Sequence, residues 1–391
     1  MKVDVDALII GGGIAGLWTL QRLRNDGYNA VLLEAEALGA GQTRYAQGIV
    51  HGGTKYALTG KLTASSEAVA EMPAIWRACH EGRGEVDLRK ATMISDAHYL
   101  WSTSSLASKI TGFFASQVMR ARTTALPPQQ RPALFRHRRF RGNIYRLDEP
   151  VFDTVSVLRA LAEPVMSSIL ATNKHTLQLA ASGLSVEAVN GDRFEFSFRR
   201  LILMAGQGNE DLLAVAGLSG PAMQLRPLKM VIMRGGLTEK VFAHCMGAGV
   251  NPRLTITSHL DNAGEIVWYM GGQLSEDGVY RSDAVQIARA RQELAELIPW
   301  LSLDRVQWAT LDINRAEVRH ADGHRPDTYY ALKQGEIITA WPTKMALAPL
   351  LARRVADLVS GIDKTASVLP DWPAPTFAEF PWCEQARWGM T

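Results

Sequence analysis

The first part of the chain alternates between continuous apolar runs and one stretch with helical spacing. Residues 6–10 and 29–34 are short, mostly apolar runs, which is the pattern of strands buried on both faces. Between these runs Leu17, Leu20 and Leu23 fall on one face of a helix. The order predicts a β–α–β unit in which a helix connects two parallel strands.

The remainder of the chain contains separate segments with the hydrophobic spacing of helices and with the pattern of strands. Helices are expected at about residues 61–79, 104–120, 153–168, 282–298 and 344–360. Strands are expected within residues 176–189, 193–198, 200–204, 224–233, 253–259, 266–271, 306–317 and 336–340. The long strands between residues 223 and 275 are punctuated by Gly-Gly pairs, which favours an antiparallel arrangement there.

These blocks predict an α/β fold with two interleaved domains. A Rossmann-like, nucleotide-binding domain is expected to comprise residues 1–76, 151–222 and 315–391. A second, α+β domain for the substrate, built on a mostly antiparallel sheet, is expected to comprise residues 77–150 and 223–314.

The turn between the first strand and the first helix carries a dinucleotide-binding fingerprint. It satisfies G-x-G-x-x-G at Gly11, Gly13 and Gly16. The first glycine permits the tight turn, the second lets a diphosphate approach the backbone, and the third lets the helix pack on the strand. Glu34 ends the second strand, where a carboxylate accepts hydrogen bonds from ribose hydroxyls and repels a 2′-phosphate. The pattern therefore predicts an ADP-containing ligand and disfavours NADP.

Composition narrows the class of protein without naming a reaction. The chain has 391 residues, of which 47% are hydrophobic and 21% charged, as in an ordinary globular protein of about two to three domains. A net charge of +3 is too small to predict nucleic-acid binding. Three distant cysteines, Cys79, Cys245 and Cys383, predict neither a disulfide framework nor a metal site. We find no apolar run of membrane-spanning length and no secretory signal, so a cytoplasmic location is expected.

A second motif follows the fingerprint and resembles a known family. Residues 39–56 contain several glycines and few apolar side chains, which places the backbone close to a large ligand. This stretch resembles the one that leads from the diphosphate to the flavin ring in the superfamily of D-amino-acid oxidase and FAD-dependent glycerol-3-phosphate dehydrogenase. Residues 48–56 are most similar to the glycerol-3-phosphate dehydrogenase and 2-hydroxyglutarate oxidase branches.

Three later segments extend the resemblance along the chain. Leu203–Gly206 resembles the strand-end A-x-G motif that covers the nucleotide, and Gly323–Pro326 resembles the G-x-R-P element. Thr339–Ala352 falls where the family has its last strand, a turn against the flavin and a closing helix. Many members have a Gly-rich turn at that point, whereas this chain has Ala340–Met345. Lys344 places a positive charge there, and Thr343 is expected to cap the helix.

The resemblance implies FAD as the cofactor and a specific set of contacts. The cofactor-binding residues expected from the fingerprint and the resemblance are Gly11, Gly13, Ile14, Ala15, Gly16, Glu34, Ala35, Gly41, Gln42, Thr43, Gln47, Gly48, Ala205, Gly206, Trp341, Pro342, Thr343, Lys344 and Met345.

Three side chains are candidates for the chemistry. His51 lies in a Gly-flanked loop, where it could accept a proton from substrate or attach to the flavin; the alternative is a structural histidine bonded to backbone. Arg325 could bind a carboxylate or phosphate; the alternative is an ion pair with a neighbouring aspartate. Lys344, or the end of the helix that follows it, could stabilise the negative charge of reduced flavin; the alternative is a solvated lysine.

The sequence thus predicts an FAD-dependent oxidoreductase that takes a hydride from a CH–OH or CH–NH carbon of a small, anionic substrate. Amino acids, 2-hydroxy acids and glycerol phosphate all fit, with oxygen, a quinone or a protein as electron acceptor. The alternatives are an NAD-dependent dehydrogenase with a single Rossmann domain and a non-catalytic flavin-binding partner protein. The basic cluster of residues 136–141 also leaves open a peripheral contact with a membrane, as in a subunit of a respiratory dehydrogenase.

Overall fold

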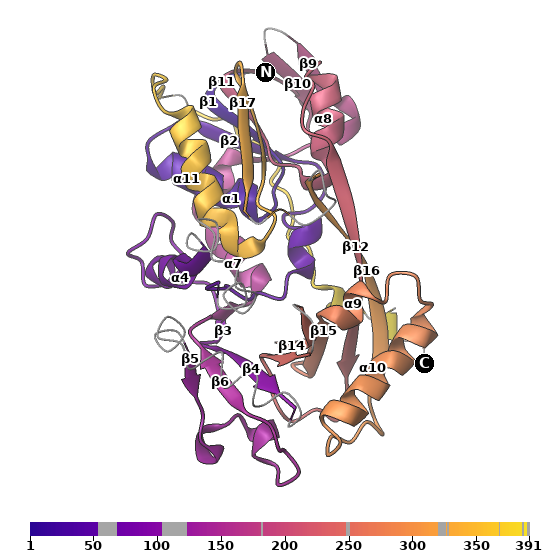
Figure 1. The fold of residues 1–391 in the computed structure, drawn as a ribbon. Helices are drawn as coiled ribbons and strands as arrows, with labels where there is room; N and C mark the ends of the chain where they lie inside the picture. The colour runs from indigo at the N-terminus through magenta and orange to yellow at the C-terminus, as the bar shows by residue number, and fades with distance from the viewer. Residues whose placement is uncertain are drawn as a thin grey trace.

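The computed structural model describes residues 1–53, 69–103, 123–180, 183–247, 251–319, 326, 328–366, 368–384 and 387–388. Each of its two lobes is built around one large sheet (Figure 1). The fold class expected from the sequence, a Rossmann-like domain interleaved with a domain on a mostly antiparallel sheet, is confirmed. The expected helix at 104–120 lies outside the described residues, as do the first residues of the one at 61–79.

The first sheet has the β–α–β unit at its centre. Its strands are β1 (Lys2–Ile10), β2 (Ala30–Glu34), β8 (Ile169–Ala171), β9 (Gln178–Ala180), β10 (Gly183–Glu187), β11 (Arg193–Leu203), β17 (Tyr330–Gln334) and β18 (Ile337–Trp341). Five of them run parallel in the order β18-β11-β1-β2-β8, and β17 and the β9–β10 hairpin pair antiparallel at the margins. The carboxyl ends of β1, β2 and β11 therefore meet at one edge, which is where such sheets bind ligands.

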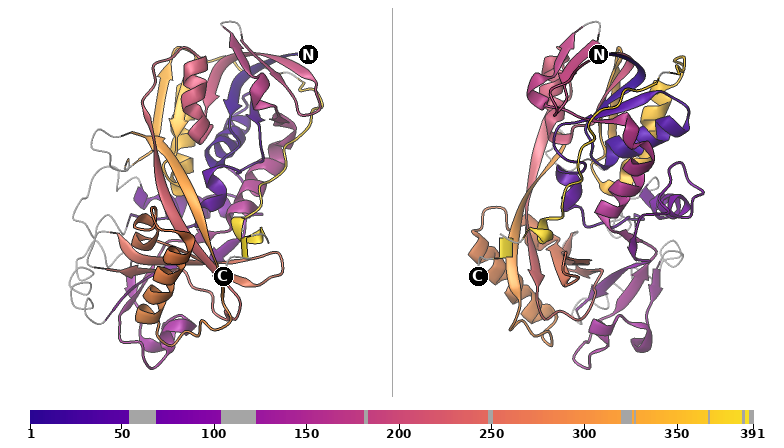
Figure 2. Two further views of the ribbon diagram at one scale, coloured as in Figure 1. Left: turned by 90° about the vertical axis from the view of Figure 1, so that its right-hand side faces the viewer. Right: turned by 180° about the vertical axis from the view of Figure 1, so that it is seen from behind.

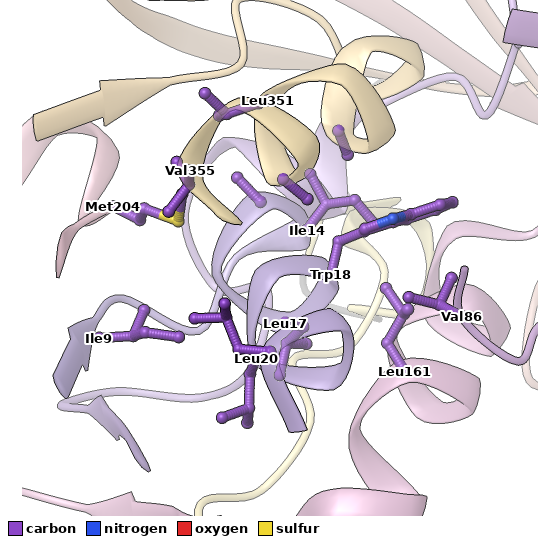
Figure 3. Packing of buried hydrophobic residues seen from close by; sticks show 14 of the residues in the cluster. Ile9, Ile14, Leu17, Trp18, Leu20, Val86, Leu161, Met204, Leu351 and Val355 are labelled. Carbon is purple, nitrogen blue, oxygen red and sulfur yellow. The ribbon is translucent and has the colours of Figure 1, made fainter. Parts of the chain in front are cut away.

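Alternate residues of β1 enter two different cores because successive side chains of a strand point to opposite faces. Ile9 belongs to the core beneath helices α1 (Ile14–Asn25), α7 (Thr154–Ala162) and α11 (Ala348–Val359), whereas Leu8 faces α8 (Asn209–Val215) and the β9–β10 hairpin. Figure 3 shows the first of these cores, where Trp18 of α1 shares a cluster with Val86, Leu161 of α7 and Leu351 of α11.

The second sheet holds the long strands expected from the sequence. Its order is β16-β12-β15-β14-β13-β4-β6-β5, antiparallel except between β13 and β4. The bounds are β4 (His98–Ser102), β5 (Thr123–Ala125), β6 (Ile144–Leu147), β12 (Met223–Arg234), β13 (Ala243–Met246), β14 (Pro252–Leu260), β15 (Ile266–Gly271) and β16 (Gln307–Val318). Helix α10 (Asp283–Leu297) covers one face, and its leucines join the core there. A small sheet of β3 (Met93–Ser95) and β7 (Val151–Phe152), with helix α4 (Met72–His80), lies near the junction of the lobes.

The division of the chain into domains stays a proposal, and one of its boundaries falls inside a strand. β16 pairs with β12 over its whole length, from Gln307 to Val318, so the expected break after residue 314 does not interrupt the second sheet. Both strands extend upward toward the first lobe (Figure 1).

The terminal segment, residues 361–388 as far as the structure describes them, was expected to belong wholly to the nucleotide-binding domain, but it joins the two lobes. Leu38 exchanges backbone hydrogen bonds with this segment, donating to Thr376 at 2.8 Å and accepting from Ala378 at 3.0 Å. The segment then reaches the face of the second sheet that α10 does not cover. There Trp382 is fully buried and stacks on His259, with ring centroids 4.4 Å apart. Figure 2 shows this yellow segment running from one lobe to the other.

We expect Trp382→Ala to lower the free energy of unfolding by about 3–5 kcal/mol, because it removes a large, fully buried side chain from the core of the second sheet. Urea titration of the protein with its cofactor measures the effect. Tyr280→Ala is the matched control, since Tyr280 is 99% exposed and its truncation should leave the midpoint in place. Equal midpoints for the two variants would contradict the assigned role of the terminal segment.

Candidate functional site

A cavity of about 1070 Å³ opens at the carboxyl ends of the parallel strands and reaches the second sheet. Ile10, Glu34 and Met204 line it from the first lobe, at or just beyond the ends of β1, β2 and β11. β12, β14 and β16 contribute side chains from the second lobe. The volume suits a ligand of dinucleotide size together with a smaller molecule.

The glycine turn gives the cavity a wall of bare backbone. Gly11 has φ +114°, and a Cβ there would lie 2.5 Å from the carbonyl oxygen of Met204. A Cβ on Gly16 would clash with the carbonyl oxygen of Gly11, so this glycine lets α1 lie against the turn. Gly13 precedes the first residue of α1 and lines the cavity. The N-terminus of α1, with its partial positive charge, is therefore directed at the cavity, as diphosphate binding requires.

Glu34 stands at the end of β2 beside this turn. Its carboxylate accepts hydrogen bonds from the backbone N–H groups of Gly12 at 2.5 Å, Ala35 at 2.9 Å and Glu36 at 2.8 Å. Burial raises the pKa of the Glu34 carboxyl and outweighs the lowering effect of those three donors. Two carboxylate oxygens offer about four acceptor sites, so acceptor capacity remains for a ribose hydroxyl. Bare backbone, a helix N-terminus and this acid fit the nucleotide half of FAD.

The loop after β2 is tied to the second lobe by two glutamines. Gln42 accepts a hydrogen bond from the backbone of Ala316 at 2.9 Å, and Gln47 donates to the carbonyl oxygen of Tyr269 at 3.1 Å. Gly48 has φ +76°, and a Cβ there would clash with the carbonyl oxygen of Phe152. These contacts hold the loop in place where it lines the cavity.

The structure brings most of the expected cofactor-binding residues to the cavity. Those that line it are Gly11, Gly13, Ile14, Ala15, Glu34, Ala35, Gly41, Gln42, Thr43, Gln47, Gly48, Ala205, Gly206, Pro342, Thr343, Lys344 and Met345. Gly16 does not line it, because it lies within α1 on the side that packs against the carbonyl oxygen of Gly11.

Trp341 also differs from the expectation. Its side chain is fully buried in the core of the first lobe, is not part of the cavity lining and donates to the carbonyl oxygen of Gly206 at 2.9 Å. Asn209, which the sequence analysis missed, assists it: this buried amide accepts from the backbone of Ala205 and donates to the carbonyl oxygen of Ala340. Both side chains support the loop after β11 and do not face the ligand space.

The turn before α11 is strained. Thr343 has φ +57°, which is unusual for a β-branched residue, and the backbone of Lys344 donates to the carbonyl oxygen of Pro342 at 2.6 Å. The expectation that Thr343 caps the helix is wrong. Its hydroxyl donates to the carbonyl oxygen of Thr328 at 3.0 Å, and α11 begins at Ala348 after a short 3₁₀ turn. Lys344 precedes that turn and lines the cavity.

His51 is paired with a buried acid at the cavity wall. Its Nδ1 lies 3.1 Å from Oε2 of Glu149, whose Oε1 accepts from the backbone N–H of Gly52 at 2.9 Å. The His51 side chain is 30% exposed and that of Glu149 only 3%. Burial by itself raises the pKa of the Glu149 carboxyl, but the hydrogen bond and charge of His51, together with the Gly52 N–H, outweigh it and hold that pKa below its ordinary value. His51 is thus bonded to a carboxylate, not to backbone as the alternative interpretation had it.

Two further histidines lie behind His51. The ring of His244 stacks on His51 with centroids 5.6 Å apart, and its Nδ1 lies 2.7 Å from the hydroxyl of Thr255. The fully buried ring of His98 lies 4.1 Å from that of His244. Burial lowers the pKa of His98 to about 3, so this ring is neutral. The sequence analysis missed Glu149, His244 and Thr255, because the strand pattern around them carries no local sign of a shared site.

Arg325 lies outside the described residues, so its expected role stays a prediction. A different arginine, Arg315 of β16, lines the described cavity together with Asn314. Among the described residues, no cluster of three or more histidine, cysteine or acidic side chains could hold a metal ion. In the same part of the chain, no helix is both long and apolar enough to cross a membrane.

Known proteins share both the sequence and the fold. Residues 6–358 match the model of the DAO family, described as FAD dependent oxidoreductase. A probable FAD-dependent oxidoreductase of Pseudomonas aeruginosa is 46% identical over 384 residues, which cover 97% of this chain and 98% of that protein. The crystal structure of a Pseudomonas aeruginosa FAD dependent oxidoreductase has a TM-score of 0.85, with 42% identity and 98% of both chains covered.

More distant structures share the fold alone. Glycine oxidase from Geobacillus kaustophilus has a TM-score of 0.63 at 16% identity, covering 93% of this chain and 96% of that one. L-α-glycerophosphate oxidase from Mycoplasma pneumoniae, solved with FAD bound, has a TM-score of 0.66 at 13% identity, covering 97% and 100%. The chain belongs to the DAO family of FAD-dependent oxidoreductases, and FAD, not NAD, is its cofactor.

Proposed function

We propose that this oxidoreductase takes a hydride from a CH–OH or CH–NH carbon of a small, anionic substrate, and that His51 accepts the accompanying proton. The observation that carries the proposal is that His51, paired with the buried Glu149, lines the same cavity as the glycine turn. FAD, when bound, supplies the two-electron acceptor. The proposed substrates are amino acids, 2-hydroxy acids or glycerol phosphate.

The imidazole of His51 is suited to this task. Its Nδ1 is engaged by Glu149, and no hydrogen bond to its Nε2 occurs among the described residues. As the carbon loses its hydride, the O–H or N–H proton moves to Nε2, leaving an imidazolium beside the buried carboxylate. That carboxylate stabilises the positive charge, so the pair lowers the barrier to proton removal.

Two distant relatives of known reaction support the substrate class. One is a glycine oxidase and the other an L-α-glycerophosphate oxidase. Arg325 is our proposed anchor for a substrate anion, through two parallel hydrogen bonds. Oxygen, a quinone or a protein is the proposed electron acceptor.

We also propose a cytoplasmic location. Cys79, Cys245 and Cys383 are all buried and free of disulfides, which fits a reducing compartment. Within the basic cluster, His137 stacks on Trp300. This contact supports the interpretation of the cluster as a structural surface loop and not as a membrane-binding patch.

Anaerobic mixing with a panel of amino acids, secondary amines, 2-hydroxy acids and glycerol phosphate tests the proposal. At least one class should bleach the blue absorbance of the bound flavin. His51→Asn should slow that reduction by about 10²–10⁴-fold, because it removes the proton acceptor. His175→Asn is the matched control, since His175 lines the cavity near Lys174 and Leu177, far along the chain from His51. A panel without any bleaching would contradict the proposal.

We expect Lys344→Met to make the reduction potential of the bound flavin more negative by about 10–20 mV, because a cation near reduced flavin stabilises its negative charge. Lys174→Met provides the control, as Lys174 also lines the cavity but lies 3.2 Å from Glu36 at the nucleotide end. Equal reduction potentials in wild type and Lys344→Met would show that Lys344 does not stabilise the reduced flavin and is a solvated lysine.

If Arg325 binds the substrate anion, Arg325→Ala should weaken the apparent affinity for the best substrate by about 2–5 kcal/mol. Titration of the flavin reduction rate against substrate concentration measures this change. Arg193→Ala serves as the control, because the Arg193 side chain is 86% exposed and lies on β11 away from the cavity. An unchanged affinity in Arg325→Ala would remove this role.

A further inference from the structure

We infer that Glu149 is a positioning residue that fixes the tautomer of His51 and so makes Nε2 the proton acceptor. The inference rests on the function proposed above. It adds a residue that the sequence analysis did not single out and that lies 98 positions from His51 in the chain.

The backbone holds the two side chains in a fixed relation. Ile49 and Val151 form an antiparallel bridge, and the backbone of Val50 donates to the carbonyl oxygen of Pro150 at 2.9 Å. His51 and Glu149 therefore leave the same small patch of paired backbone, one from each side. The paired backbone fixes both Cα atoms, so only the side-chain rotamers remain to be ordered when the pair forms.

Both oxygens of the carboxylate are committed to adjacent residues. Oε2 lies 3.1 Å from Nδ1 of His51, and Oε1 accepts from the Gly52 N–H at 2.9 Å. An ionised carboxylate can only accept hydrogen bonds, so the proton in the first contact must sit on Nδ1. A neutral imidazole with its proton on Nδ1 presents a lone pair at Nε2, which is the atom free to take a proton from substrate.

The neighbouring groups do not offer His51 a second anion. His98 is fully buried and neutral, and His244 stacks on the His51 ring while its own Nδ1 lies 2.7 Å from the Thr255 hydroxyl. Among the described groups that contact His51, Glu149 is therefore the one carboxylate.

Replacement of this acid by its amide should move the proton of the His51 ring to the other nitrogen. In Glu149→Gln the Gly52 N–H still requires an acceptor, so the amide oxygen stays on that side. The amide NH₂ group then faces Nδ1 of His51 and donates to it. The ring must carry its proton on Nε2, which removes the acceptor from the cavity although shape and volume hardly change.

Nitrogen NMR of the FAD-loaded protein labelled with ¹⁵N-histidine, in alkaline buffer, reads the tautomer directly. We expect the wild-type His51 ring to be protonated on Nδ1 and the Glu149→Gln ring to be protonated on Nε2. His51→Asn identifies the signals by their loss. The buried ring of His259, which stacks on Trp382, is an internal reference that should not change. Glu293→Gln is the matched control, because Glu293 is a buried glutamate bonded to Arg253 and Arg289 and not to a histidine.

Flavin reduction provides the second measurement. With a substrate from the panel, Glu149→Gln should reduce its flavin about 10²-fold more slowly than wild type while binding FAD equally well, whereas Glu293→Gln should match wild type. A wild-type His51 protonated on Nε2 would overturn the inference even if the variant fails to fold. A Glu149→Gln protein in which the His51 tautomer and the rate of flavin reduction are both unchanged would also overturn the inference. If no compound bleaches the wild-type flavin, the proposed function fails, and the NMR result alone supports or overturns the role of Glu149.

Discussion

The contact between the backbone of Gly11 and that of Gly16 sets the geometry on which the site depends. No side chain fits between them, so α1 starts directly against the end of β1. Because β1 is the central strand of the first sheet, the helix terminus is fixed relative to the ends of β2 and β11 as well. Bare backbone, helix terminus and Glu34 therefore converge on one region without any of them having to move. A larger residue at Gly16 would push α1 away from the turn, and one at Gly11 would push the turn away from Met204 at the end of β11.

The second lobe completes the site by long-range contacts. Gln42 and Gln47 fasten the nucleotide loop to β16 and to Tyr269, and the His51–Glu149 pair closes the wall beside it. The acid is buried, its two oxygens are both bonded, and the ring next to it is partly exposed to the cavity. Burial of a charge is costly unless hydrogen bonds compensate it, and here the compensation comes from the group that the acid orients. Under the proposed mechanism, the same contact serves both stability and chemistry.

Local sequence patterns predicted the parts of the structure that local chemistry determines. The β1–α1–β2 unit follows from two apolar runs and helical spacing, and α10 was expected at 282–298 and lies at Asp283–Leu297. Residues whose roles depend on distant partners could not be found in this way. Glu149 meets His51 only because the bridge between Ile49 and Val151 brings two segments together. The expected cavity position of Trp341 and the expected capping role of Thr343 differ from the structure for a related reason, since the partners that hold them, Gly206 and Thr328, are not neighbours in the chain.

The terminal segment has a consequence for biosynthesis. Phe380 and Trp382 cover a face of the second sheet whose strands are all made earlier in translation. Domains generally fold in the order in which they leave the ribosome. One apolar face of this sheet therefore stays exposed to solvent until Phe380 and Trp382 have been synthesised. A transcript cut short before Phe380 would leave that face permanently uncovered, which would expose the nascent chain to chaperones and proteases instead of yielding a shortened enzyme.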